Sequence, residues 1–95
     1  MKITMIDYPA CPYCRQALKL IDELKREHPE YGFIEIEKIN EVFERRRAAE
    51  YDGYYYCPSF FYGKRKLYEA DPSYSREEAK EKLGAMLASL ATGGV

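Results

Sequence analysis

The tetrapeptide Cys11-Pro12-Tyr13-Cys14 constrains this chain more than any other feature. It lies where an apolar run, residues 3–8, gives way to apolar residues at helical spacing. This pattern predicts that Cys11 stands at the exposed start of a helix that follows a strand. Unpaired backbone N–H groups and the positive end of the helix dipole stabilise a thiolate there. One turn further on, Cys14 comes round beside Cys11, so the pair can close a small disulfide ring.

Length and charge limit the classes of function. The chain has 95 residues, which is enough for one core, and we expect a single domain over residues 1–95 with no bound organic cofactor. The net charge is −1, from 15 basic and 16 acidic residues that are interspersed. This balance predicts neither nucleic acid nor a membrane surface as a partner. No run of about 18 apolar residues, as a membrane helix requires, is present.

Cysteine usage points to a redox role in a reducing compartment. Residues 1–8 are too short and too polar for a signal peptide, so we expect a cytoplasmic protein. There a Cys-x-x-Cys pair is more often redox-active or metal-binding than a permanent crosslink. A zinc site needs two more ligands, and only Cys57 and His28 remain. His28 should lie roughly 20 Å away along the first helix, so we expect no metal site. An inert pair is the other alternative.

Hydrophobic periodicity predicts four strands and three helices. The expected strands are residues 2–8, 33–39, 59–62 and 65–69, and the expected helices are residues 12–28, 40–52 and 75–90. Asn40 is the expected N-cap of the second helix, whose apolar stripe is thin: Val42, Phe43 and Ala49. Gly63-Lys64 suits a type II′ hairpin turn, and residues 92–95 should fray. The order β-α-β-α-β-β-α predicts an α/β fold with a four-stranded mixed sheet and three flanking helices.

This order of elements, with Cys-Pro-Tyr-Cys after the first strand and a proline opening the third, resembles the glutaredoxin branch of the thioredoxin superfamily. The resemblance covers nearly the whole chain. It implies a thioredoxin-like fold of the glutaredoxin type, with Cys11 as the attacking thiol and Cys14 as the resolving thiol. Pro58 would be the cis-proline that faces the disulfide. The backbone of Cys57 would then pair with an extended substrate, either glutathione or a peptide.

Three further positions belong to the expected substrate site. Pro12 takes the first helical position at no cost in hydrogen bonds and restricts the disulfide ring. Tyr13 either shields the thiol, contacts a partner or is simply exposed to solvent. Asp71 would receive the γ-glutamyl group of glutathione, together with the start of the last helix at Ser73 and Ser75.

Two departures from the glutaredoxin pattern affect glutathione recognition. Tyr8 stands where glutaredoxins usually carry a basic residue, and Leu67-Tyr68, with Glu69 beyond, stands where they usually carry Gly-Gly. An arginine of the run 45–47 is the alternative partner for a carboxylate of glutathione. A solvated helix face is the plainer interpretation of that run.

Cys57 is the unusual feature of the site. It is either a small buried residue, a soft ligand or a third redox thiol that pairs with Cys11 under oxidation. The tyrosine run 54–56 before it is a candidate aromatic rim for partner binding.

The expected function is that of a monomeric thiol–disulfide oxidoreductase that reduces protein disulfides or glutathione mixed disulfides through Cys11 and Cys14. Its expected partners are oxidised proteins together with glutathione, as a co-substrate, or a disulfide reductase. A redoxin reduced by a flavin-dependent reductase is the first alternative. A non-catalytic module that binds an iron–sulfur cluster or senses oxidation is the second.

Overall fold

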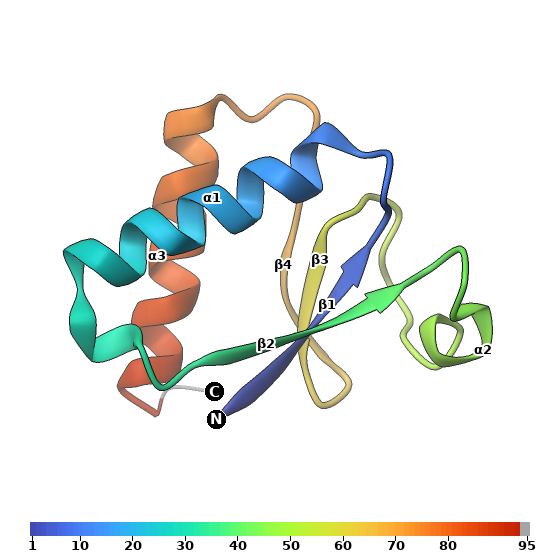
Figure 1. The fold of residues 1–95 in the computed structure, drawn as a ribbon, viewed down its shortest axis with the longest axis horizontal. Coiled ribbons are helices and arrows are strands. Elements are labelled where there is room, and N and C mark those ends of the chain that lie inside the picture. Colours follow the sequence, from blue (N-terminus) through green and yellow to red (C-terminus); the bar gives the residue numbers. More distant parts are fainter. Residues whose placement is uncertain (94–95) are drawn as a thin grey trace.

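A four-stranded mixed sheet forms the centre of the molecule (Figure 1). This computed structural model describes residues 1–93, and its strands are β1 (Lys2–Asp7), β2 (Glu35–Asn40), β3 (Ser59–Tyr62) and β4 (Arg65–Glu69). Their order across the sheet is β2-β1-β3-β4, with β1 parallel to β2 and the other neighbours antiparallel. The predicted α/β class and mixed sheet are confirmed, and the fold is thioredoxin-like. The expected fraying of the tail includes residues 94 and 95, which lie outside the described residues.

The hairpin between β3 and β4 contains a glycine turn and a β-bulge. Gly63 has a φ of +61°, whereas the φ of Lys64 is not positive. This combination fits the predicted type II′ turn. The pairing register then shifts between Phe60 and Phe61, which marks a bulge in the hairpin. Such a bulge changes the face on which the following side chains of a strand lie.

Two long helices cover one face of the sheet, α1 (Pro12–Glu27) and α3 (Arg76–Ala91), with a short 3-10 helix η1 (Pro29–Tyr31) after α1 (Figure 1). Helix α1 begins at a proline, which needs no partner for a backbone N–H. Helix α3 begins at a capping box, in which Ser75 and Glu78 accept each other's backbone N–H at 3.1 and 3.2 Å. Both helix starts follow from local sequence.

The main core lies between the sheet and the two long helices. Side chains from all three layers are buried in it: Ile3, Met5, Leu20, Leu24, Phe60, Leu83 and Leu87. A smaller cluster of Ile6, Ile39, Ala48 and Phe61 lies on the other face. The two faces separate because successive side chains of a strand point in opposite directions, as Met5 and Ile6 do.

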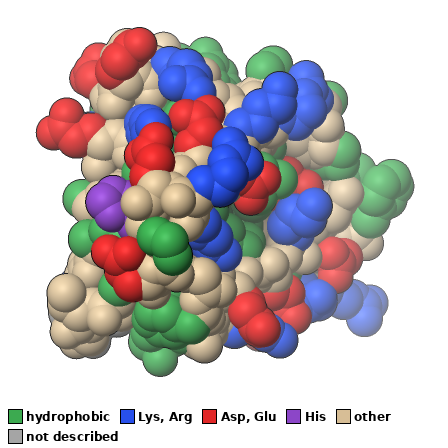
Figure 2. Space-filling view, turned by 60° about the vertical axis from the view of Figure 1, so that its left-hand side comes forward, with side chains coloured by type: hydrophobic (Ala, Val, Ile, Leu, Met, Phe, Trp, Pro, Cys, Tyr) green, Lys and Arg blue, Asp and Glu red, His purple; other side chains and the backbone are tan. Residues whose placement is uncertain are grey.

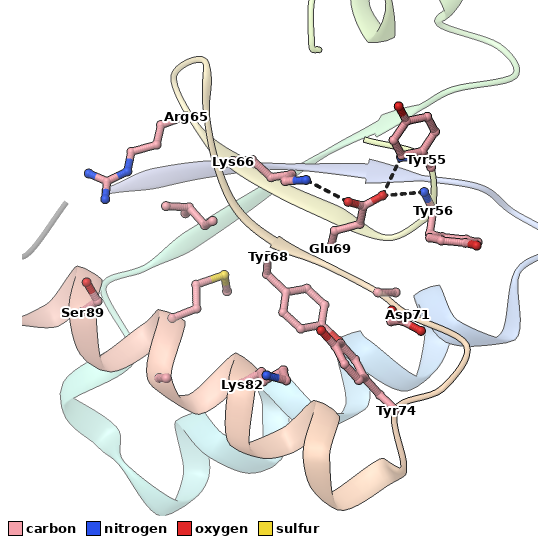
Figure 3. Close-up of a pocket in the computed structure, with 14 residues that line it drawn as sticks. Tyr55, Tyr56, Arg65, Lys66, Tyr68, Glu69, Asp71, Tyr74, Lys82 and Ser89 are labelled. Carbon is pink, nitrogen blue, oxygen red and sulfur yellow. Dashed lines mark hydrogen bonds and ion pairs between the residues drawn. The ribbon is translucent and has the colours of Figure 1, made fainter. Parts of the chain in front are cut away.

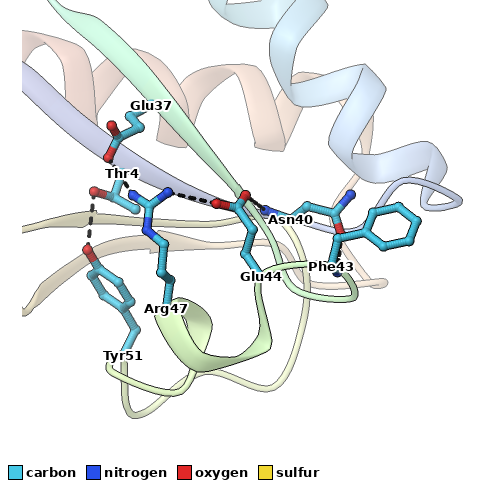
Figure 4. A network of polar contacts seen from close by, with 7 residues as sticks. All are labelled: Thr4, Glu37, Asn40, Phe43, Glu44, Arg47 and Tyr51. Atoms are coloured by element: carbon cyan, nitrogen blue, oxygen red, sulfur yellow. Dashed lines mark hydrogen bonds and ion pairs between the residues drawn. The ribbon is translucent and has the colours of Figure 1, made fainter.

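The second predicted helix is mostly wrong. Instead of residues 40–52, the helix α2 spans only Arg45–Ala48. Asn40 ends β2, and its Oδ1 accepts the backbone N–H of Val42 at 2.9 Å. It also accepts the backbone N–H of Phe43 at 3.0 Å (Figure 4). An asparagine side chain that satisfies these N–H groups stabilises a turn in place of a helix. Phe43 is 83% exposed, so no apolar stripe forms there.

Two ion pairs and one small buried side chain hold helix α2 against the sheet. Arg47 joins Glu44 at 2.7 Å and Glu37 of β2 at 3.1 Å (Figure 4). Ala48 is buried against the sheet, whereas Ala49, which belonged to the predicted stripe, is exposed. Arg47 therefore helps to fasten α2 to the edge strand of the sheet.

Charged side chains of both signs alternate over the face shown in Figure 2. Between the long helices, Glu23 pairs with Arg76 and with Lys80, and Lys80 also pairs with Glu27 at 2.8 Å.

Within residues 1–93, none of the helices is both long enough and apolar enough to cross a membrane.

Candidate active site

Cys11 directly precedes α1 and closes a turn that starts at Tyr8. Its N–H donates to the Tyr8 carbonyl at 3.0 Å, and its own backbone is extended, with φ −88° and ψ 119°. The side chain is half-buried, and its thiol donates to the carbonyl oxygen of Cys57 at 3.4 Å. The predicted position of Cys11, at a helix start after a strand, is confirmed.

Cys14 lies on the first turn of α1 and is only 2% exposed. The N–H of Tyr8 donates to its Sγ at 3.4 Å. Burial raises the pKa of the Cys14 thiol well above its ordinary value; the Tyr8 N–H opposes this, and the carboxylate of Asp7 adds to it. Both cysteines are free thiols in this structure. The pair therefore consists of an accessible thiol and a protected, protonated one.

A cavity of about 290 Å³ opens beside Cys11. Its walls are mostly aromatic: Tyr8, Tyr13, Tyr55 and Tyr56, with Glu41, Cys57, Ala70 and Pro72 completing them. The Cys57–Pro58 peptide bond is cis, as the resemblance implies, and Pro58 is buried. A half-buried thiol at the edge of an aromatic cavity is accessible to a bulky disulfide.

The structure brings together three of the residues expected at the site. Cys11, Tyr13 and Cys57 line this one cavity, while Pro12 is exposed at the first position of α1. Asp71 does not line it but lies along a neighbouring groove. The chemical roles of these residues stay predictions.

Several residues considered for binding glutathione already make contacts within the chain. The Asp71 carboxylate accepts the Ser73 N–H at 2.8 Å, and this hydrogen bond lowers the pKa of Asp71. Ser75 caps α3, and Arg47 pairs with two glutamates near β2. Binding of glutathione by any of these groups would have to compete with contacts inside the chain.

Glu41 is a carboxylate of the site that sequence reasoning missed. It lines the cavity and accepts the hydroxyl of Tyr54 at 3.0 Å. The signal lay in the topology: Asp7 pairs with Asn40 at the carboxyl ends of two parallel strands, so the residues that follow each strand meet. Burial, and then the Glu41 carboxylate, raise the pKa of Cys57 to about 12.

This shifted pKa predicts slow alkylation of Cys57. At pH 8 its thiolate fraction should be about 1000-fold below that of an ordinary cysteine with a pKa of 9.0. The rate of reaction with iodoacetamide, followed by peptide mass mapping, should rise about tenfold per pH unit up to pH 10. N-acetylcysteine is the control and should level off above pH 9. A plateau for Cys57 in the same range would contradict the prediction.

Glu69 is the second carboxylate that sequence reasoning left without a role. Its side chain accepts the backbone N–H groups of Tyr55 and Tyr56 and pairs with Lys66 at 2.8 Å (Figure 3). Burial acts to raise the pKa of Glu69, but Lys66 and the two amides outweigh it, so the pKa is lowered. Glu69 thus holds the loop that forms one wall of the cavity.

Replacing Glu69 with glutamine should lower the free energy of unfolding by about 2 kcal/mol at pH 7, because hydrogen bonds to a charged acceptor are lost. A lowered carboxyl pKa stabilises the fold above the ordinary value of 4.5, and this contribution is lost as the pH falls through the lowered pKa. The difference from wild type in urea unfolding should therefore shrink at pH 3. Glu81→Gln, on the exposed side of α3, is the matched control and should change little at either pH. An equal deficit at pH 3 and pH 7 would contradict the role of the charge.

Comparisons with known proteins place this geometry in context. No family model matches the chain. Two relatives named Probable Thioredoxin, from Methanothermobacter marburgensis and Methanothermobacter thermautotrophicus, are each 37% identical over 51 residues, which is 54% of this chain and 58% of the relative. The chain thus spans little more than half the length of these relatives.

A solved structure described as "Structure of a malarial protein" is similar with a TM-score of 0.55 at 15% identity, and the match covers 90% of this chain and 96% of that one. At that identity the likeness shows the fold alone. The two relatives and the thioredoxin-like fold together support a place in the thioredoxin superfamily.

Proposed function

We propose that this chain is a thiol–disulfide oxidoreductase that reduces protein disulfides through Cys11 and Cys14. The observation that carries the proposal is the asymmetry of the pair: the Cys11 thiol borders an aromatic cavity, and Cys14 lies buried within the first turn of α1. One accessible and one protected thiol are what a two-step exchange requires. The relatives named Probable Thioredoxin support the same class of chemistry.

The proposed reaction has two exchange steps. The Cys11 thiolate attacks one sulfur of the substrate disulfide and displaces the other sulfur as a thiolate, which leaves a mixed disulfide. Cys14 then loses its proton and attacks the Cys11 sulfur, so the second substrate sulfur leaves and a Cys11–Cys14 disulfide forms. Two electrons pass to the substrate, and an external donor restores the dithiol. The Asp7 carboxylate, which raises the pKa of the Cys14 thiol, is the proposed acceptor of the Cys14 proton.

Protein disulfides suit this site better than glutathione mixed disulfides. Tyr8 occupies the position of the usual basic residue, and Asp71 is bonded within its own turn. The aromatic walls offer contact area to a polypeptide, and tyrosine is enriched at protein interfaces. A disulfide reductase is accordingly the proposed electron donor, with glutathione as the alternative.

The test compares two donor systems on one protein disulfide and one glutathionylated peptide. One system is glutathione with glutathione reductase, and the other is thioredoxin reductase; both are followed by NADPH oxidation. We expect turnover of the protein disulfide with thioredoxin reductase and loss of that turnover in Cys14→Ser. Turnover with glutathione that survives the Cys14 substitution would assign glutaredoxin chemistry instead. Absence of NADPH oxidation with every pairing of donor system and substrate would contradict the oxidoreductase proposal.

A further inference from the structure

A second hollow, the β4–α3 groove, runs between β4 and α3 and has a volume of about 650 Å³ (Figure 3). Residues 65–71 line one side of it, and Lys82, Met86 and Ser89 of α3 line the other. Seven consecutive residues on one wall mean that the groove follows the strand along its length. Its shape therefore suits an extended chain.

The β4–α3 groove is continuous with the cavity at Cys11. Tyr55, Tyr56 and Ala70 line both hollows. A polypeptide whose disulfide lies at Cys11 can thus continue over these residues into the groove. β4 is also the last strand of the sheet, so its outer edge offers main-chain groups to such a segment.

Charge is distributed unevenly along this path. Glu69 and Asp71 lie at the end near Ala70, whereas Arg65 is four residues before Glu69 along β4, a distance of about 13 Å. Within residues 1–93, neither Arg65 nor Lys82 has an ion-pair partner, and Lys82 Nζ lies 5.1 Å from the ring centroid of Tyr74. Arg65 therefore marks the far end of the groove, on the side of Ser89, whereas Lys82 lies beside Tyr74 and nearer to Asp71 (Figure 3).

We propose that the β4–α3 groove binds the polypeptide segment that flanks the reactive cysteine of a disulfide-bearing partner. Arg65 selects a segment with an acidic residue roughly five positions from that cysteine, since an extended chain spans about 3.3 Å per residue. Arg65 supplies the ion pair, Lys82 adds a second positive charge along the path, and Met86 and the tyrosines supply apolar contact. This inference rests on the proposed function and names its substrate class.

The test uses synthetic peptides whose single cysteine is linked to 5-thio-2-nitrobenzoate. Cys11 attacks the peptide sulfur, a peptide–protein disulfide forms and the coloured nitrothiobenzoate leaves, so its release reports the reaction. A Cys14→Ser background stops the reaction at this stage. One peptide carries glutamates about five positions to either side of the cysteine, and a second carries glutamines there. Cysteine linked to nitrothiobenzoate, which has no flanking segment, is the small reference disulfide.

We expect the glutamate peptide to reach half-saturation at a concentration roughly fivefold below that of the glutamine peptide, as one exposed ion pair of about 1 kcal/mol allows. The double variant Arg65→Glu/Lys82→Glu should remove this preference and leave the rate with the small reference disulfide unchanged. The matched control is Lys19→Glu/Lys38→Glu, which makes the same change of net charge at exposed positions on α1 and β2. It should keep the preference.

Equal half-saturation for the two peptides, or a preference that survives the Arg65→Glu/Lys82→Glu change, would overturn the inference. Sedimentation velocity of the wild type and the double variant adds a second readout. A dimer that disappears in the double variant would assign the groove to a second copy of the chain and would also overturn it. If nitrothiobenzoate is not released even from the small reference disulfide, the proposed function itself is refuted.

Discussion

Cys11→Ser should lower the rate of protein-disulfide reduction at least about 1000-fold, because a serine hydroxyl forms no mixed disulfide and the first exchange step is lost. The rate is measured as donor-dependent NADPH oxidation in the presence of excess protein disulfide. Thiol and hydroxyl differ little in size, and Cys11 lies at the N-cap position, where serine is favoured. The fold should therefore persist, which circular dichroism and urea unfolding would check.

Cys57→Ser is the matched control for Cys11→Ser. Its carbonyl oxygen, which accepts the Cys11 thiol, belongs to the backbone and is kept in the variant. The thiol itself has a pKa of about 12 and is protonated at neutral pH, so most of the activity should remain. A large loss in Cys57→Ser would show that a third thiol takes part in the exchange, contrary to the two-cysteine mechanism. Peptide mapping of the oxidised protein would then identify the disulfide that Cys57 forms.

Phe60→Ala should lower the free energy of unfolding by about 4 kcal/mol, the largest loss of stability expected from a single change here. Phe60 is 0% exposed and pairs with Met5 across β1 and β3, while its ring centroid lies 6.0 Å from that of Tyr68. Its removal leaves a cavity between the sheet and the long helices, which these close-packed layers cannot fill without distortion. Urea unfolding at pH 7 measures the change.

Phe43→Ala makes the same chemical change at a residue that is 83% exposed. It should alter the free energy of unfolding by less than about 0.5 kcal/mol. Similar losses in the two variants would contradict the assignment of Phe60 to the core and of Phe43 to the surface.

The elements that sequence reasoning predicts well are those whose patterns are local. The capping box at Ser75 and Glu78, the proline at the start of α1 and the glycine turn at Gly63 each define an element by contacts within a few residues. The bounds of the four strands agree with the expected ranges to within two residues. The helix expected after Asn40 fails for the same kind of reason, because the asparagine side chain closes a turn that the hydrophobic pattern does not reveal.

The site is predictable only in part. The placement of Cys11 follows from the strand and helix around it, but the partners of Glu69 depend on the register of the hairpin. Residues three apart in a regular strand point to opposite faces, so Lys66 and Glu69 would not meet. The shift between Phe60 and Phe61 changes this alternation, and the two side chains pair at 2.8 Å. A bulge of this kind is not encoded in a local pattern, and neither is the loop that Glu69 consequently holds.

The hydrogen bond from the Cys11 thiol to the Cys57 carbonyl makes one proton serve two purposes. While the proton is present, the sulfur is a weak nucleophile, and the proton takes one of the two lone pairs of the carbonyl oxygen. Loss of the proton turns the thiol into a nucleophilic thiolate and at the same time removes this hydrogen bond from the carbonyl oxygen. The thiolate state is therefore the state in which the Cys57 carbonyl has its full capacity to accept hydrogen bonds from another chain.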